Sequence, residues 1–169
     1  MAEDTDVKTE EAPAPEQAAK RRATAKKKAS KKQDRQIVFV KSKRKRAIAR
    51  ASAKSGSGRI RINGYDINMF EPLELRRLML EPVHVSSSTH EAARRMDIDI
   101  NVYGGGQSSQ AQAVRGAIAK SISESSDGDS VKKEYMAFDR FMLIDDTRRV
   151  EPKKFKGPKA RARFQKSYR

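Results

Sequence analysis

The stretch "KRKRAIARASAKSGSGRIRING", residues 43–64, decides the type of fold. Alanine occupies every second position from residue 47 to residue 53, and mostly polar residues lie between. A period of two places alternate side chains on opposite faces of a strand, so the alanines form one smooth face. Alanine, arginine and lysine are good helix formers, and by propensity alone they favour a helix over 43–54. The periodicity contradicts this preference and predicts a strand.

The residues after this strand predict a turn and a further strand. The sequence "SGSG" at 55–58 is typical of a turn. Arginine and isoleucine then alternate from residue 59 to residue 62. We therefore predict that the two strands form a hairpin, with Arg50, Arg59 and Arg61 available along its exposed surfaces.

The other elements follow from the spacing of apolar residues and from proline and glycine. They are a strand at 37–40, a helix that begins at Pro72 and ends at Pro82, a short helix at 86–96, a strand at 97–103, a long helix capped by Ser108 or Ser109 with Ala111, Val114, Ile118 and Ile122 on its buried side, and a helix or helix-to-strand segment marked by Val131, Tyr135, Phe138 and Met142. Early strands followed by helices, a strand and more helices predict an α+β fold.

The net charge of +16 is distributed unevenly over the 169 residues. Residues 1–35 are rich in alanine, proline, glutamate and lysine, and we predict a disordered charged extension. Residues 36–147 carry 18 bases and 14 acids and are expected to form the globular domain. Residues 148–169 carry ten bases and a single acid, and they are expected to form an extended basic tail that becomes ordered only on a polyanion.

Composition also excludes several classes of function. The chain has no cysteine, which excludes disulfides, zinc ribbons and thiol catalysis. We find no apolar run long enough to span a bilayer and no secretory signal, so no membrane partner is expected. Nucleic acid is the expected partner of so basic a chain.

Two motifs in the domain are candidates for phosphate binding. "GGGQSSQ", residues 104–110, follows a strand and precedes a helix, so its backbone N–H groups could hold an anion. A tight strand-to-helix turn explains the same glycines equally well, and both interpretations stay open. Five cations in residues 41–46 favour a phosphate-facing surface over a solvated strand edge.

No set of residues indicates catalysis or a resident metal. His84 and His90 lack further ligands at a defined spacing, and we interpret them as ordinary surface or half-buried histidines. Asp145 and Asp146 are interpreted as a turn before the tail rather than as a magnesium site. No nucleophile motif is present. The chain is therefore predicted not to be an enzyme and to need no cofactor.

The tail combines cations with aromatic residues and helix-breaking residues. Phe155, Phe164 and Tyr168 stand among lysines and arginines, which suits stacking on bases and riboses. Pro152 and the adjacent Gly157–Pro158 pair prevent a continuous helix. Fully extended, residues 153–169 would span about 55 Å, which exceeds the width of a small domain.

Four motifs lie within a stretch that runs from about residue 37 to residue 169: "KRKRAIARA", "GSGRIRING", "VYGGGQSSQAQAVRGAI" and "RRVEPKKFKGPKARARFQKSYR". Together they resemble the universal small-subunit ribosomal protein nine family, and the ending "KSYR" is similar to its archaeal and eukaryotic branch. The resemblance implies a fold like the second domain of ribosomal protein five, a four-stranded sheet with helices on one face. It also implies a cytoplasmic, ribosomal location in the head of the small subunit, with rRNA and neighbouring ribosomal proteins as partners.

The resemblance further implies that the tail passes through rRNA toward the anticodon stem-loop of peptidyl-site tRNA. The residues expected near tRNA are Lys166, Ser167, Tyr168 and Arg169. The residues expected to bind rRNA are Lys43, Arg44, Lys45, Arg46, Arg50, Arg59, Arg61, Gly104, Gly105, Gly106, Gln107, Arg115, Arg148, Arg149, Lys153, Lys154, Lys156, Lys159, Arg161 and Arg163.

Two other functions are compatible with the charge. A free-standing protein that compacts DNA or RNA would need only the basic flanks. An enzyme acting on nucleic acid would need a carboxylate or histidine cluster, and the sequence shows no convincing one. Nuclease turnover that depends on Asp145 would favour this function.

Overall fold

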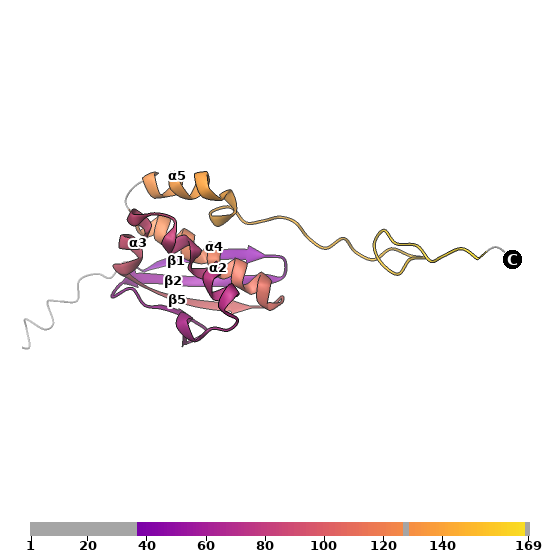
Figure 1. Ribbon diagram of the computed structural model, residues 1–169, viewed down its shortest axis with the longest axis horizontal. Coiled ribbons are helices and arrows are strands. Elements are labelled where there is room, and N and C mark those ends of the chain that lie inside the picture. Colours follow the sequence, from indigo (N-terminus) through magenta and orange to yellow (C-terminus); the bar gives the residue numbers. More distant parts are fainter. Residues whose placement is uncertain (1–36, 127–128, 168–169) are drawn as a thin grey trace, which may run out of the picture. The chain divides into compact units, whose positions relative to one another are not determined.

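The computed structural model describes residues 37–126 and 129–167 (Figure 1). The predicted extension 1–35 therefore lies outside the described residues. The described elements are β1 (Val38–Arg44), β2 (Ala47–Ser55), β3 (Ile60–Ile62), β4 (Tyr65–Asp66), the 3-10 helix η1 (Ile67–Met69), α2 (Leu73–His84), α3 (Ser87–Arg94), β5 (Met96–Tyr103), α4 (Gln107–Ser125), α5 (Asp129–Phe138) and the 3-10 helix η2 (Arg140–Met142). This confirms the α+β class.

The sheet has five strands in the order β1-β2-β5-β3-β4, not the four that were expected. β1, β2 and β5 are antiparallel neighbours, β3 runs parallel to β5, and β4 is antiparallel to β3. The additional strand is β4, which is only two residues long and lies at the edge. No helix among the described residues is long and apolar enough to cross a membrane.

The predicted hairpin between residues 47–54 and 60–62 is wrong, because β5 lies between these strands. The hairpin partner of β2 is β1. The "SGSG" loop instead wraps the start of β5, where the Asp97 carboxylate accepts the backbone N–H groups of Ser57 (2.8 Å) and Arg59 (3.1 Å). Ile98 and Ile100 of β5 are thereby placed between the alanines of β2 and the isoleucines of β3.

The helices cover one face of the sheet, as predicted (Figure 1). Burial alternates along β2 and β5, and the four alanines of β2 are between 0% and 3% exposed. The predicted stripe on α4 is buried, with Ile118 and Ile122 completely enclosed. Small residues fill the rest of this helix surface, including Ala113, Gly116 and Ala117. The alanine face of β2 therefore packs against a helix that is itself largely small-sided.

Three helix predictions need correction. α4 begins after Gly106, so neither Ser108 nor Ser109 is its N-cap. α2 does not end at Pro82 but continues to His84, two residues further on. Pro82 is buried, and its carbonyl oxygen accepts a hydrogen bond from the Tyr135 hydroxyl at 2.8 Å. Phe138 is 55% exposed, whereas Val131, Tyr135 and Met142 are buried, because α5 ends at Phe138 and the chain turns into η2.

Truncation of Ile118 in α4 tests whether this helix is tightly packed against the sheet or only loosely associated with it. We expect Ile118→Ala to lower the free energy of unfolding by about 2–5 kcal/mol, because the side chain is fully enclosed and its removal leaves a cavity. The matched variant Ile144→Ala removes the same atoms from a side chain that is 42% exposed and should cost much less. Urea unfolding of both variants measures the difference, and equal losses would contradict the described core.

Candidate nucleic-acid interface

The two candidate phosphate-binding motifs, 60 residues apart in the sequence, lie against each other. Gly104 and Gly105 have positive φ values of +76° and +67°. A Cβ atom added to Gly104 would lie 2.6 Å from the carbonyl oxygen of Arg46, and one added to Gly105 would lie 3.1 Å from the backbone nitrogen of Ala47. The glycines are therefore required both by the backbone conformation and by the close approach of the turn between β1 and β2.

This contact places cations beside the N-terminus of the longest helix. Lys45 and Arg46 form the exposed β1–β2 turn, and Lys45 itself has a φ of +53°. Gly106 is the N-cap of α4 and supplies no side chain, so the first N–H groups of the helix are not capped by it. A helix N-terminus carries positive potential. The turn and the helix end together form an anion-attracting surface. We call this surface, residues 43–46 and 104–107, the domain tip.

Not all predicted cations are free to meet a phosphate. Arg115 is 13% exposed and lies between Glu81 and Asp139, with N–O distances of 2.6 Å and 2.7 Å. Arg61 forms a two-pronged pair with Asp99, at 2.8 Å and 3.4 Å. The structure thus gives these two arginines carboxylate partners within the domain. Lys45, Arg46, Arg50 and Arg59 remain exposed.

Asp146 fixes the base of the tail to the domain. Its carboxylate pairs with Arg44 of β1 at 2.8 Å and accepts both the side chain and the backbone N–H of Arg148. An isolated parallel bridge joins Arg44 to Asp146 along the backbone. These contacts hold the pKa of Asp146 at about 2, chiefly through the hydrogen bonds from Arg148 and then through the charges of Arg148 and Arg44. We call this group the tail clamp (Arg44, Asp146 and Arg148).

Asp145 adds a second tie between the tail base and the core. Its carboxylate accepts the Lys120 ammonium of α4 at 2.6 Å and the Ser42 hydroxyl of β1 at 3.2 Å. A polar cavity of about 160 Å³ lies beside both aspartates and is also lined by Gln112. The interpretation of Asp145 and Asp146 as a simple turn thus missed their role as anchors, because Ser42 and Arg44 of β1 lie about 100 residues earlier in the sequence.

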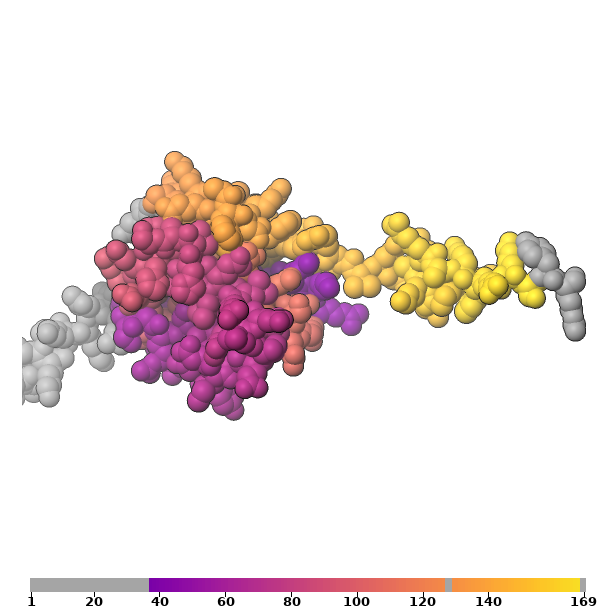
Figure 2. Space-filling model, viewed as in Figure 1, coloured from indigo at the N-terminus to yellow at the C-terminus, as the bar shows by residue number. Residues whose placement is uncertain are grey.

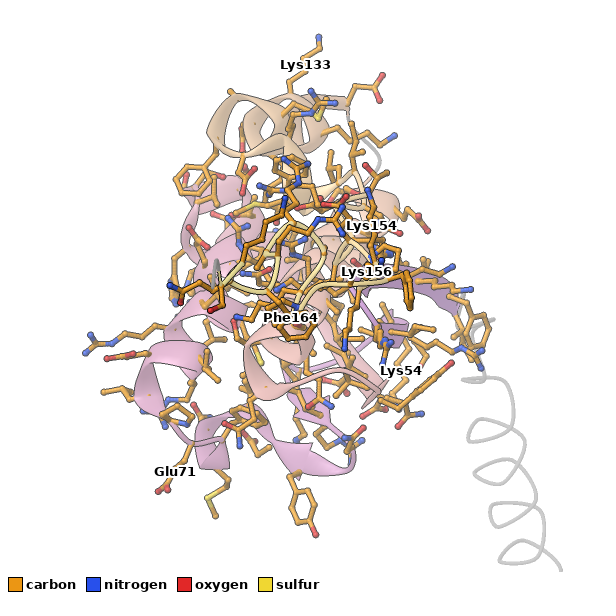
Figure 3. The ribbon with its side chains drawn as sticks, turned by 90° about the vertical axis from the view of Figure 1, so that its right-hand side faces the viewer. Lys54, Glu71, Lys133, Lys154, Lys156 and Phe164 are labelled. Carbon is orange, nitrogen blue, oxygen red and sulfur yellow. The ribbon has the colours of Figure 1, made fainter. Side chains whose placement is uncertain are left out.

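Beyond the tail clamp, the tail is open to solvent. Phe155 and Phe164 are 86% and 66% exposed. Within the described part of the tail, the side-chain hydrogen bonds and ion pairs of residues 150–167 join partners inside that same segment. Figure 3 labels Lys154, Lys156 and Phe164 along it. The tail therefore keeps most of its cations available.

The tail is not extended throughout, in contrast to the prediction. Residues 155–161 form a loop in which Lys156 has a φ of +57°. The Arg163 guanidinium donates to the Phe155 carbonyl at 2.8 Å, and Arg161 pairs with Glu151 at 2.9 Å. Gly157 is buried in this loop, where an added Cβ would collide with the Ala162 carbonyl. Proline and glycine thus allow a compact bend here rather than a straight path.

The open face of the sheet carries further cations and aromatic rings. Arg50 of β2 lies over the ring of Tyr103 in β5, with its guanidinium carbon 5.7 Å from the ring centroid. Tyr103 is 47% exposed and Phe39 is 77% exposed. Sequence reasoning selected Arg50 but missed Tyr103 and Phe39. The alternation of side chains along each strand could have identified Tyr103 and Phe39, because it places both on the face opposite the buried residues.

The predicted tRNA-proximal residues are only partly described. Lys166 and Ser167 are exposed, whereas Tyr168 and Arg169 lie outside the described residues. The exposed His84 and half-buried His90 stack with ring centroids 5.9 Å apart. Within residues 37–126 and 129–167, no group of three or more histidine, aspartate or glutamate side chains is arranged to hold a metal ion.

Comparison with known proteins identifies the family. Residues 42–169 match the family described as ribosomal protein S9/S16. The chain belongs to the ribosomal protein S9/S16 family. This is a family of structural ribosomal proteins, so membership confirms the predicted ribosomal, non-enzymatic role.

Individual members of the S9/S16 family from archaea are similar over most of the chain. A protein named small ribosomal subunit protein uS9 from Picrophilus torridus is 48% identical over 128 residues, which cover 75% of this chain and 93% of the relative. Proteins with the same name from Halobacterium salinarum and Methanothrix thermoacetophila are 46% and 45% identical over 133 residues, covering 79% of this chain and 99% and 98% of the relatives. These matches confirm the predicted archaeal-type branch.

The tail clamp should make stability depend on pH in acid. Because the pKa of Asp146 is lowered from 3.8 to about 2 in the folded chain, its contribution is present above about pH 4 and is lost as the pH falls toward 2. We expect Asp146→Asn to reduce the fall in the free energy of unfolding between these pH values. Part of the fall should persist, since backbone hydrogen bonds from Ser57 and Arg59 also lower the pKa of Asp97. Urea titrations at several pH values measure it, and an unchanged slope would refute the clamp.

The close approach at the domain tip can be tested with two glycine variants. Gly104→Ala and Gly64→Ala both place alanine at a positive φ, at a cost of about 1–2 kcal/mol. Only Gly104→Ala also brings a Cβ against the Arg46 carbonyl, since no atom lies within 4 Å at Gly64. We expect the Gly104 variant to lose about 1–3 kcal/mol more in the free energy of unfolding. Equal losses in chemical denaturation would contradict the contact between the two turns.

Proposed function

We propose that the chain is a structural constituent of the small ribosomal subunit that binds rRNA in the subunit head and extends its C-terminal tail to the anticodon stem-loop of peptidyl-site tRNA. Three curated relatives carry the name small ribosomal subunit protein, which supports the subunit assignment. The contacts with rRNA and tRNA are inferred from the charge and geometry described above.

The domain tip supports rRNA binding through the phosphate backbone. Lys45 and Arg46 are exposed beside the uncapped N-terminus of α4, and Gly105 and Gly106 expose backbone in the same place. Backbone N–H groups and cations bind phosphates without reading base sequence. In this proposal Arg115 and Arg61 are support residues, because each already has a carboxylate partner.

The single observation that carries the proposal is the solvent-open basic tail fixed at its base. Residues 148–167 hold nine cations and a single acid, and beyond Arg149 the described part forms its side-chain polar contacts only with itself. Such a segment cannot bury enough apolar surface to become ordered alone. A surround of phosphates supplies the missing interactions, and each contact releases condensed counterions.

Aromatic residues in the tail fit RNA better than a uniformly charged surface. Phe155 and Phe164 expose their rings between cations, and stacking on bases tolerates any sequence. Lys166, near the end, supplies a cation without a partner among the described residues. A tip that contacts tRNA phosphates rather than bases would serve every tRNA, since phosphate contacts carry no sequence information.

Removal of the tail end should separate tRNA binding from subunit assembly. We expect small subunits reconstituted with a chain lacking residues 164–169 to form normally, because the domain tip and most of the tail remain. Their peptidyl-site tRNA affinity should fall about tenfold or more, as charge-assisted contacts are lost. The salt dependence of tRNA binding should also become less steep. Filter binding at several salt concentrations measures both effects.

The matched control replaces Lys132 and Lys133, two exposed lysines of α5, with glutamine. This variant removes charge from the chain but not from the tail, and tRNA affinity should stay at the wild-type value. Truncated subunits that hold tRNA as tightly as wild type at every salt concentration would remove the tRNA role. Sedimentation of the chain with free RNA or DNA, rather than with the small subunit, would favour a free-standing nucleic-acid-compacting protein.

A further inference from the structure

One edge of this basic domain has the opposite chemistry. Between Gly64 and Leu75 the sequence contains three acids and no lysine or arginine. The same stretch exposes large apolar side chains: Tyr65 is 76% exposed, Met69 is 79% exposed and Leu73 is 46% exposed. We call Tyr65, Asp66, Met69, Glu71, Leu73 and Glu74 the acidic-apolar patch.

The acidic-apolar patch is one continuous surface at the β4 edge of the sheet. It runs from β4 through η1 to the first turn of α2. The segment forms the lower, magenta part of the domain in Figure 2, and Figure 3 labels Glu71 there, away from Lys133 of α5. β1 and the tail clamp lie at the other edge of the sheet. The patch is therefore separate from the tail base.

The carboxylates of the patch leave charge to be neutralised. Asp66 is used locally, since it accepts the backbone N–H of Asn68 at 2.9 Å as the cap of η1. Glu71 and Glu74 are exposed, and neither has an ion-pair partner within the described residues. Beside them lies a shallow groove of about 500 Å³, lined by Phe70, Glu71, Pro72, Leu73 and Arg76. The Arg76 guanidinium is held there by the carbonyl of Asn68. The patch thus offers a site for apolar side chains next to two unpaired acids.

We propose that the acidic-apolar patch docks a basic polypeptide segment of a neighbouring protein, with an apolar side chain in the groove and lysine or arginine on Glu71 and Glu74. The patch carries three carboxylates, and the one base that lines its groove, Arg76, already donates to the carbonyl of Asn68. The net negative charge therefore repels a phosphate backbone, and RNA is the disfavoured occupant. A second copy of the same patch would bring like charges together. β4 is only two residues long, so docking through side chains is favoured over the addition of a strand.

This inference rests on the proposed ribosomal function, because the partner is sought in the assembled small subunit. The chain lacks cysteine, so Met69→Cys introduces a unique thiol for a benzophenone photo-cross-linker. Met136→Cys is the matched probe site, at a methionine of α5 that is 48% exposed beside Lys132 and Lys133. Subunits that contain each labelled chain are purified, irradiated and separated into protein and RNA adducts, and cross-linked peptides are identified by mass spectrometry.

We expect the probe at residue 69 to cross-link a protein segment rich in lysine and arginine. Glu71→Gln with Glu74→Gln, introduced beside Met69→Cys, should lower the yield of that adduct about two- to fivefold, the scale of exposed ion pairs. The same double substitution should leave the yield from residue 136 unchanged.

Three results would overturn the proposal: adducts of residue 69 with rRNA, a cross-linked segment without excess basic residues, or no adduct at residue 69 when residue 136 reacts. Failure of the proposed function is distinguishable, because the labelled chain would then be absent from the purified subunits before irradiation.

Discussion

The packing of α4 on the alanine face of β2 determines how the other elements of the domain are placed. Every buried side chain of β2 is alanine, and the facing helix contributes further small residues, including Gly116. A Cβ at Gly116 would lie 2.5 Å from the Ser42 hydroxyl of β1, so helix and sheet approach closely. Because such an interface has little room for adjustment, it fixes where both ends of α4 lie relative to the strands.

This fixed helix brings together residues that would carry separate parts of the proposed function. At its N-terminus the glycine turn meets the β1–β2 turn, which creates the domain tip. Further along α4, the Gln112 side chain accepts a hydrogen bond from Arg44, and the Lys120 ammonium donates to Asp145. These contacts support the tail clamp. The tail consequently starts from an anchored base, although most of its own cations remain available. In the proposed function, the packed domain positions the RNA-binding groups, and RNA supplies the order that the open tail lacks.

The sequence predicted what depends on local period and composition, and it failed where distant segments compete. Alternation identified the strands, and steps of three and four identified the buried stripe of α4. The turn sequence "SGSG" suggested a hairpin. In the structure Asp97 binds the backbone of that loop and holds it beside the start of β5, and no local sequence pattern indicates this contact. The family resemblance located the basic motifs and the tail. It could not show that Arg115 is held by Glu81 and Asp139, or that Asp146 anchors the tail, because those pairings exist only in the folded chain.

In the proposed function, the domain tip and the tail form one RNA-binding surface that starts at the tail clamp. A density map of the assembled small subunit containing this chain would reveal whether RNA lies on this surface. We expect rRNA phosphates against Lys45, Arg46 and the start of α4, with the tail enclosed by RNA beyond Arg149. A map in which the domain tip faces solvent, or in which the tail folds back onto its own domain, would contradict it.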